Sequence, residues 1–130
     1  MAHLGFTPQS EHALGGYRVQ GRGAAADRMI EDAQALQAAG AFAVVLEMVP
    51  ADVAKRVTAE LDIPTIGIGA GPDCDAQVLV WSDMAGMNRG RKPRFVKQYA
   101  DVGTVLLDAA RRFSTDVTTG RYPSEEHSYS

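Results

Sequence analysis

Apolar and polar residues follow one another in blocks that predict helices separated by short buried strands. From Ala25 to Ala39, apolar residues recur at spacings of three and four, acidic residues lie near the start and Gly40 follows the end, which predicts an amphipathic helix. Residues 51–61 show the same helical period. Two almost wholly apolar runs, 42–49 (FAVVLEMV) and 63–69 (IPTIGIG), have the pattern of parallel strands buried on both faces.

The remaining segments predict fewer regular elements. Residues 77–81 (QVLVW) predict a third strand, residues 94–99 and 104–115 predict helices, residues 2–24 predict a long loop and the polar tail from Gly120 predicts extended chain. Helices that alternate with apolar strands indicate βα units and therefore an α/β fold. A closed TIM-type (β/α)8 barrel needs eight strands and typically about 250 residues. We therefore expect the chain to form roughly half of such a barrel.

Composition and charge narrow the class of protein. The chain has 130 residues, 45% of them hydrophobic, which is typical of a protein with a packed core. Its net charge of -3 and the absence of a basic cluster argue against binding to nucleic acid. The single cysteine, Cys74, cannot form an internal disulfide, and no run is long and apolar enough to cross a bilayer. These features predict a cytoplasmic protein that binds no membrane.

Glu47 is the most informative residue for chemistry. It is the only charged residue in an apolar predicted strand, and it lies three positions before Pro50, which ends that strand. Burial of a lone carboxylate costs several kcal/mol unless the group is paired, protonated or near water. Active sites of α/β folds form at the carboxyl ends of parallel strands, so a general base is one interpretation. A structural carboxylate that caps a loop or pairs with an arginine is the other.

His3 is the second candidate site residue. It lies in the segment His3-Leu-Gly-Phe-Thr-Pro, where an imidazole at a strand end could hold a substrate oxygen or exchange a proton. A structural histidine is the alternative. His12 and His127 lie in polar surroundings and are expected at the surface.

Glycine and charge clusters give weaker signals. The segment GIGAGP from Gly67 lacks the third glycine of a dinucleotide-binding motif, and the segment GRGAAA from Gly21 lacks the preceding strand. The helix start after Gly21 could still bind an anion. We expect the three nearby arginines to belong to a solvated loop and the loop aspartates to bind no metal; these residues are Arg18, Arg22 and Arg28, and Asp73, Asp75 and Asp83.

Several motifs together resemble one enzyme family. The segments are HLGFTPQS from His3, LGGYRVQGR from Leu14, VLEMVP from Val45, IPTIGIGAG from Ile63 and YPSEEHS from Tyr122. In this order they resemble the motifs of ketopantoate hydroxymethyltransferases. The resemblance runs from the first residues to the last, and it is more specific than any single glycine pattern.

The resemblance implies a fold, a reaction and two site residues. The fold is that of the phosphoenolpyruvate/pyruvate group of barrels. The reaction transfers a one-carbon unit from 5,10-methylenetetrahydrofolate to 3-methyl-2-oxobutanoate and gives 2-dehydropantoate, a precursor of pantothenate. Mg²⁺ chelates the keto acid, a glutamate removes the C3 proton and the enolate attacks the methylene carbon. Glu47 stands at the position of this base, and His3 at the position of a substrate-binding histidine.

The sequence also predicts the surroundings of this base. Because side chains alternate along a strand, Val45 and Val49 are expected on the face of Glu47, where they would desolvate the carboxylate and strengthen it as a base. Leu46 and Met48 are expected to face the helices.

The chain departs from the family's pattern at its beginning. Family members carry about four further βα units before the segment at His3. Those units hold the Mg²⁺ ligands and a lysine that binds the keto acid. We therefore expect residues 1–130 to form a single partial barrel domain that contains no metal ligand. Ala76 also stands where the family tends to have glycine.

Two expectations follow for the isolated chain. The first is that it is the C-terminal half of the enzyme, inactive alone, and that its partners are the keto acid, the folate, and either a second copy or an N-terminal half. The alternative is a non-catalytic remnant or interaction module that docks onto itself or onto an N-terminal half, because an unpaired parallel strand edge favours association.

Overall fold

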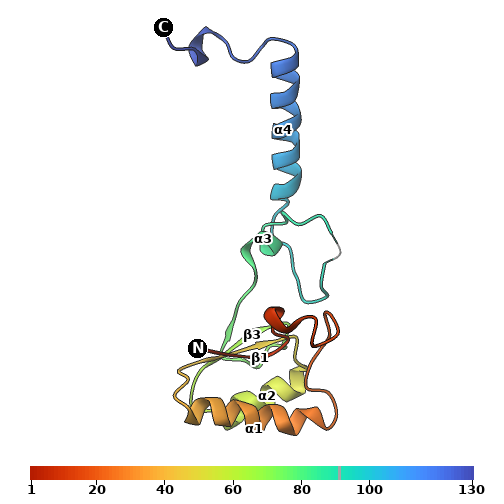
Figure 1. The fold of residues 1–130 in the computed structure, drawn as a ribbon, viewed down its shortest axis with the longest axis vertical. Coiled ribbons are helices and arrows are strands. Elements are labelled where there is room, and N and C mark those ends of the chain that lie inside the picture. Colours follow the sequence, from red (N-terminus) through yellow and green to blue (C-terminus); the bar gives the residue numbers. More distant parts are fainter. Residues whose placement is uncertain (91) are drawn as a thin grey trace. The chain divides into compact units, whose positions relative to one another are not determined.

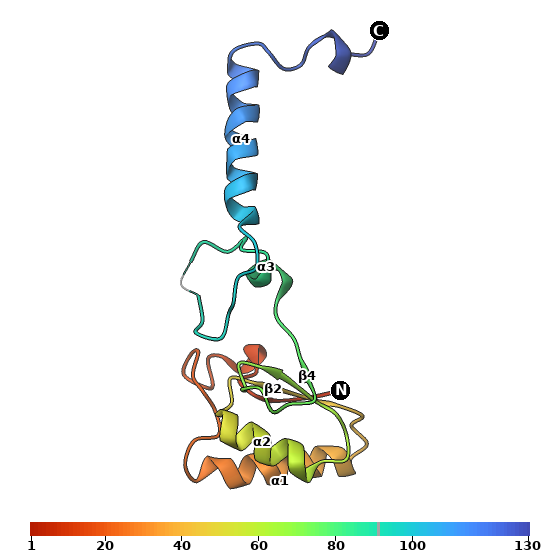
Figure 2. The same cartoon turned by 180° about the vertical axis from the view of Figure 1, so that it is seen from behind.

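The computed structural model describes residues 1–90 and 92–130. The described chain forms two compact units, Met1–Leu79 and Val80–Ser130 (Figures 1 and 2).

The first unit is built on a four-stranded parallel sheet with the strands in chain order. The strands are β1 (Ala2–Gly5), β2 (Val44–Glu47), β3 (Thr65–Ile68) and β4 (Ala76–Gln77). In the register of the pairs, His3 lies beside Val45 and Gly5 beside Glu47. Parallel strands end at the same edge of a sheet, so this register brings the ends of β1, β2 and β3 together.

Two helices cover one face of this sheet (Figures 1 and 2). Helix α1 spans Ala25–Ala38 and helix α2 spans Ala51–Glu60. Val44 and Leu46 of β2 are fully buried and belong to a core cluster with apolar residues of both helices: Ala26, Met29, Ala33, Val53, Ala54 and Val57. Val45 and Glu47 alternate with these residues, are only half-buried and therefore lie on the opposite face of the sheet.

Strand alternation stops directly after Glu47. Met48 has a φ of 51°, in the left-handed region, and Val49 is buried in the same core cluster as Leu46. The expectation that Val49 shares the face of Glu47 is therefore wrong. Met48, which was expected to face the helices, is not part of this core cluster. The period of two applies to extended backbone only, and β2 ends at Glu47.

The other element boundaries differ from the sequence predictions in specific places. Residues 2–24 were expected to be a loop, but Ala2–Gly5 forms β1, and Pro8–Ser10 forms a short 3-10 helix, η1. A strand of four residues is too short to show a period by itself and is fixed here by pairing with β2. The predicted β2 began too early, since Phe42 lies before the strand and is 70% exposed.

The predicted strand 77–81 is largely wrong. Strand β4 covers only Ala76–Gln77 at the edge of the sheet, and Trp81 begins a helix instead. The helix expected at residues 94–99 is also wrong, because this segment forms turns and irregular chain. A helix of so few residues has little stability of its own.

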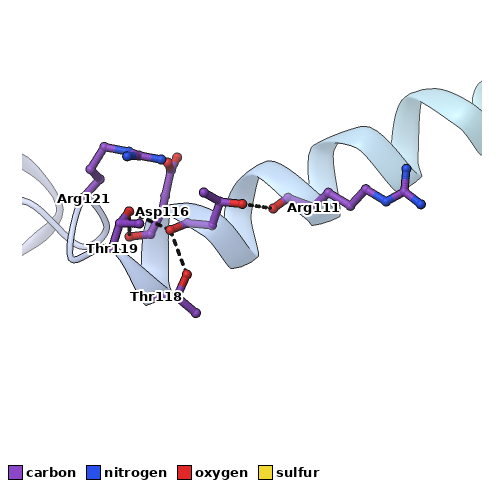
Figure 3. Close-up of polar contacts among 6 residues, drawn as sticks. Arg111, Asp116, Thr118, Thr119 and Arg121 are labelled. Carbon is purple, nitrogen blue, oxygen red and sulfur yellow. Dashed lines mark hydrogen bonds and ion pairs between the residues drawn. The ribbon is translucent and has the colours of Figure 1, made fainter.

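The second unit contains two helices and a short 3-10 helix: α3 (Trp81–Met84), α4 (Val102–Thr118) and η2 (Glu125–His127). Helix α4 is amphipathic and extends the predicted helix 104–115 at both ends. The Asp101 side chain accepts a hydrogen bond from the Thr104 N–H and caps its start. At its end, the Thr118 and Thr119 hydroxyls donate to the Thr115 carbonyl, and Arg121 pairs with Asp116 (Figure 3).

The α/β class with a parallel sheet is confirmed. Among the described residues, no helix combines the length and apolar character needed to span a membrane.

Candidate active site

Two candidate residues, His3 and Glu47, meet on the sheet face opposite α1 and α2. His3 comes from β1 and Glu47 from the last position of β2. The His3 Nε2 atom lies 3.1 Å from the Glu47 Oε2 atom. This is an ion-pair distance when the imidazole is protonated, but the contact lacks the geometry of a hydrogen bond. Pairing of β1 with β2 thus joins residues that are 44 positions apart in the sequence.

Both side chains are partly shielded from water. The Glu47 side chain is 15% exposed and the His3 side chain 32% exposed. The His3 Nε2 atom is itself buried and has no hydrogen-bond partner within the described chain. A buried polar atom without a partner costs free energy unless a ligand or water forms a hydrogen bond with it. The Nε2 atom therefore has an unused hydrogen-bonding capacity directly beside the Glu47 carboxylate.

Neighbouring β-branched residues give the Glu47 face an apolar character. In the register of the sheet, Val45 lies beside Ile66, and Glu47 lies beside Ile68. Val45 and Ile66 are half-buried, and Ile68 is buried. The expected apolar neighbours of Glu47 thus include Val45 but not Val49, and β3 supplies two further residues that the sequence analysis did not assign.

The backbone around Glu47 is fixed by the end of β1. The Phe6 N–H donates a 2.8 Å hydrogen bond to the Glu47 carbonyl oxygen. Gly5 has a φ of 88°, and a Cβ atom at this position would lie 2.1 Å from the same oxygen and 2.7 Å from Val49 Cγ2. Only glycine fits so close to the neighbouring strand. Gly5 was not predicted as a site residue from the sequence, although its place two residues after His3 was a usable signal.

A polar network joins the start of β3 to the segment before β4. Asp75 accepts hydrogen bonds from the N–H and the hydroxyl of the fully buried Thr65. Both hydrogen bonds lower the pKa of the Asp75 carboxyl group, and the bond from the Thr65 N–H has the larger effect. The Thr65 hydroxyl also lies 2.9 Å from that of Thr58 in α2. Burial raises the pKa of the adjacent Cys74 thiol, so this thiol remains protonated near neutral pH.

The other aspartates of the sequence analysis lie apart. Asp73 is 3.8 Å from Lys55, and Asp83 accepts a hydrogen bond from Asn88. Across residues 1–90 and 92–130, no three His, Cys, Asp or Glu side chains form a group that could hold a metal ion. The described residues of this chain alone therefore do not fit a magnesium site.

The glycine segment before α1 borders a cavity of about 380 Å³, separate from the His3 and Glu47 pair. Its lining includes Arg22 and Arg56 as well as Asp52. Arg56 pairs with Asp27 at 2.6 Å, which offsets its positive charge.

The two histidines other than His3 have different surroundings. His127 lies 2.7 Å from the Ser124 hydroxyl in a capping box, and His12 lies in the loop after η1.

Comparison with known proteins identifies the family. The family model described as ketopantoate hydroxymethyltransferase matches residues 1–125. The chain belongs to the ketopantoate hydroxymethyltransferase family. This membership confirms the resemblance predicted from the five motifs. It also puts both His3 and Glu47 within the matched segment.

Curated members of the ketopantoate hydroxymethyltransferase family are close relatives. The proteins named 3-methyl-2-oxobutanoate hydroxymethyltransferase from Saccharopolyspora erythraea and Acidothermus cellulolyticus are each 69% identical over 129 residues. That from Frankia casuarinae is 67% identical over the same length. The matches cover 99% of this chain but only 44%, 48% and 44% of the respective relatives. The chain thus spans less than half their length and matches their C-terminal half.

Proposed function

We propose that this chain supplies the proton-abstracting part of a 3-methyl-2-oxobutanoate hydroxymethyltransferase. In the proposed reaction, the C3 proton of the keto acid is removed, and the resulting enolate forms a C–C bond to the one-carbon unit of 5,10-methylenetetrahydrofolate. Water supplies the hydroxyl oxygen of the new hydroxymethyl group, the C–N bonds of the methylene carbon break, and tetrahydrofolate is released. The product is 2-dehydropantoate, which leads to pantothenate. The observation that carries this proposal is the meeting of Glu47 and His3 at 3.1 Å on the sheet face opposite α1 and α2, in a chain that belongs to this family.

Glu47 is the proposed general base. A base must reach the proton that it removes and must not be fully hydrated, because hydration weakens a carboxylate. The Glu47 side chain is 15% exposed and stands beside the apolar side chain of Ile68. It is therefore both accessible and largely desolvated, as proton removal from carbon requires.

His3 is the proposed substrate-binding residue. Its Nε2 atom is buried, has no hydrogen-bond partner among the described residues and lies beside the Glu47 carboxylate. A substrate oxygen could form the missing hydrogen bond with this nitrogen while the C3 proton faces Glu47. The binding contact would then also align the proton with its base.

The remaining components are proposed to lie outside this chain. Mg²⁺ would stabilise the developing enolate charge when bound, and its ligands are expected in the part of the enzyme that precedes the matched segment. That part would also complete a (β/α)8 barrel of which residues 1–130 form one partial domain. The partners would be the keto acid, the folate, and a second copy or the N-terminal half. We expect the enzyme to work in the cytoplasm, consistent with a lone cysteine.

A chimera tests the assignment of the base. In this chimera, the 129 matched residues of this chain replace the corresponding segment of the Saccharopolyspora erythraea relative, which is 69% identical to them. Deuterium exchange at C3 of 3-methyl-2-oxobutanoate measures proton removal without the folate step. We expect exchange by the chimera and a loss of about 10²- to 10⁴-fold in Glu47→Gln, which keeps the shape of the side chain but removes its basicity.

His3→Ala should give a different kinetic result. Because His3 is proposed to bind substrate, this variant should raise KM for the keto acid and lower the exchange rate less than Glu47→Gln does. Undiminished exchange in Glu47→Gln would refute the assignment of the base. A folded chimera without exchange would instead favour the non-catalytic interaction module.

A further inference from the structure

Met48, the residue directly after Glu47, has an unusual backbone conformation. Its φ of 51° is the only positive φ of a non-glycine residue among the described parts of the chain. Side chains with a Cβ atom disfavour this left-handed region, and such outliers persist only where their surroundings fix them.

The positive φ of Met48 changes the sheet face to which the side chain after it points. Leu46 and Val49 are three positions apart, so in a continuous strand they would point to opposite faces. Both are buried in the core cluster under α1 and α2. The turn at Met48 therefore allows Leu46 and Val49 to be buried in the same core. Glu47, between them, points to the opposite sheet face, where it lies near His3.

Three backbone hydrogen bonds hold this turn. The Met48 N–H donates to the Ile68 carbonyl at 2.9 Å, and the Met48 carbonyl accepts from the Gln20 N–H at 2.9 Å. The Glu47 carbonyl accepts from the Phe6 N–H at 2.8 Å. The partner groups belong to Phe6 directly after β1, Ile68 at the end of β3 and Gln20 in the loop before α1, so the conformation is fixed from three directions.

We infer that Met48 is a positioning residue for proton removal: its left-handed backbone sets the direction of the Glu47 carboxylate. This inference rests on the proposed function, in which Glu47 is the base. An extended backbone at Met48 would place Val49 on the face of Glu47 and out of the core, so the chain could keep its core contacts only if the end of β2 shifted and moved the carboxylate relative to His3. A misplacement of about 1 Å can lower a rate by roughly 10²-fold, so the reaction is sensitive to this turn.

The test compares substitutions at Met48 that differ in their tolerance of the left-handed region. In the chimera, Met48→Val introduces a β-branched side chain that disfavours this region, whereas Met48→Asn removes the same thioether but tolerates it. Val57→Ala is the matched control, because Val57 is a fully buried residue of α2 and its truncation destabilises the fold without changing a residue of β2 or of the turn at Met48. Met48→Ala replaces Met48→Val if the latter does not fold.

The readouts are kcat and KM of deuterium exchange, together with the melting temperature of each variant. We expect Met48→Val to lower kcat by at least about 10-fold with KM for the keto acid nearly unchanged. Met48→Asn should retain most of the parent kcat, and Val57→Ala should lower the melting temperature without lowering kcat.

Two outcomes would overturn the inference, and each can be told apart from failure of the proposed function. A parent-like kcat in Met48→Val, or an equal loss in Val57→Ala, would show that Met48 contributes only to stability while Glu47 remains the base. Undiminished exchange in Glu47→Gln, measured in the same series, would instead remove the base and the positioning role together.

Discussion

Gly5 and Glu47 lie beside each other in the β1–β2 pair, and the space between their backbones limits what position 5 accepts. The Cβ atom of any other residue would lie 2.1 Å from the Glu47 carbonyl oxygen, well inside van der Waals contact. The φ of 88° at Gly5 is a second obstacle, because residues with a Cβ atom disfavour it. The geometry of the candidate base therefore depends on the smallest residue of the neighbouring strand.

Gly5→Ala should lower the free energy of unfolding by about 2 kcal/mol or more, since it combines backbone strain with a clash. Gly40→Ala is the matched control. Gly40 has a similar φ of 96°, but a Cβ atom there would meet nothing within 4 Å. Chemical denaturation of the chimera measures both variants. Equal losses would contradict the clash and leave only the backbone strain that the two positions share.

At the scale of elements, the start of β3 is tied to the segment before β4 by the Asp75 carboxylate. Its hydrogen bonds to the Thr65 N–H and hydroxyl favour the ionised form and hold its pKa below the ordinary value of 3.8. A depressed pKa in the folded state means that the stabilisation is present above pH 3.8 and is lost as the pH falls through the folded value.

Asp75→Asn should therefore lower the melting temperature of the chimera at pH 7 by more than it does at pH 3. The difference between parent and variant should begin to shrink as the pH falls below about 4. Asp75 is exposed, which keeps the effect small, so the comparison needs melts of both proteins in identical buffers. Asp32→Asn, which removes the same charge from an exposed position of α1, is the control. A gap between Asp75→Asn and the parent that stays constant with pH would argue against the carboxylate network.

At the scale of the whole molecule, the chain supplies one candidate base and one candidate substrate-binding residue but no group of side chains for a metal within its described residues. Its relatives are more than twice as long. The proposed chemistry needs an enolate that is stabilised by positive charge, and a carboxylate alone is a weak base toward carbon.

We accordingly expect the chain by itself to show no measurable transferase activity with Mg²⁺, 3-methyl-2-oxobutanoate and methylenetetrahydrofolate. The chimera should be active under the same conditions, and its activity should fall in Glu47→Gln. Product formation can be followed by chromatography of 2-dehydropantoate. Turnover by the isolated chain, or an active chimera that ignores Glu47→Gln, would be inconsistent with this division of roles.

The amphipathic helices and the two strands that lie within longer apolar runs could be predicted from the sequence because their patterns are local. Helix α1 was predicted to within one residue, and both strands β2 and β3 lie inside the predicted apolar runs. Strand β1 could not be predicted, since its four residues become a strand only through pairing with β2. The helix predicted at 94–99 failed for the related reason that six residues carry too little periodicity to outweigh their surroundings.

In the candidate site, too, some features could be predicted from the sequence and others depended on the tertiary structure. The sequence by itself determined the family, through long motifs in a fixed order, and it singled out Glu47 as the one charge of an apolar strand. Only the tertiary structure decided that Glu47 faces His3, that Val49 turns into the core and that Gly5 must be glycine. The physical reason is that these contacts depend on strand register and on a single left-handed residue, and neither leaves a periodic trace in the sequence.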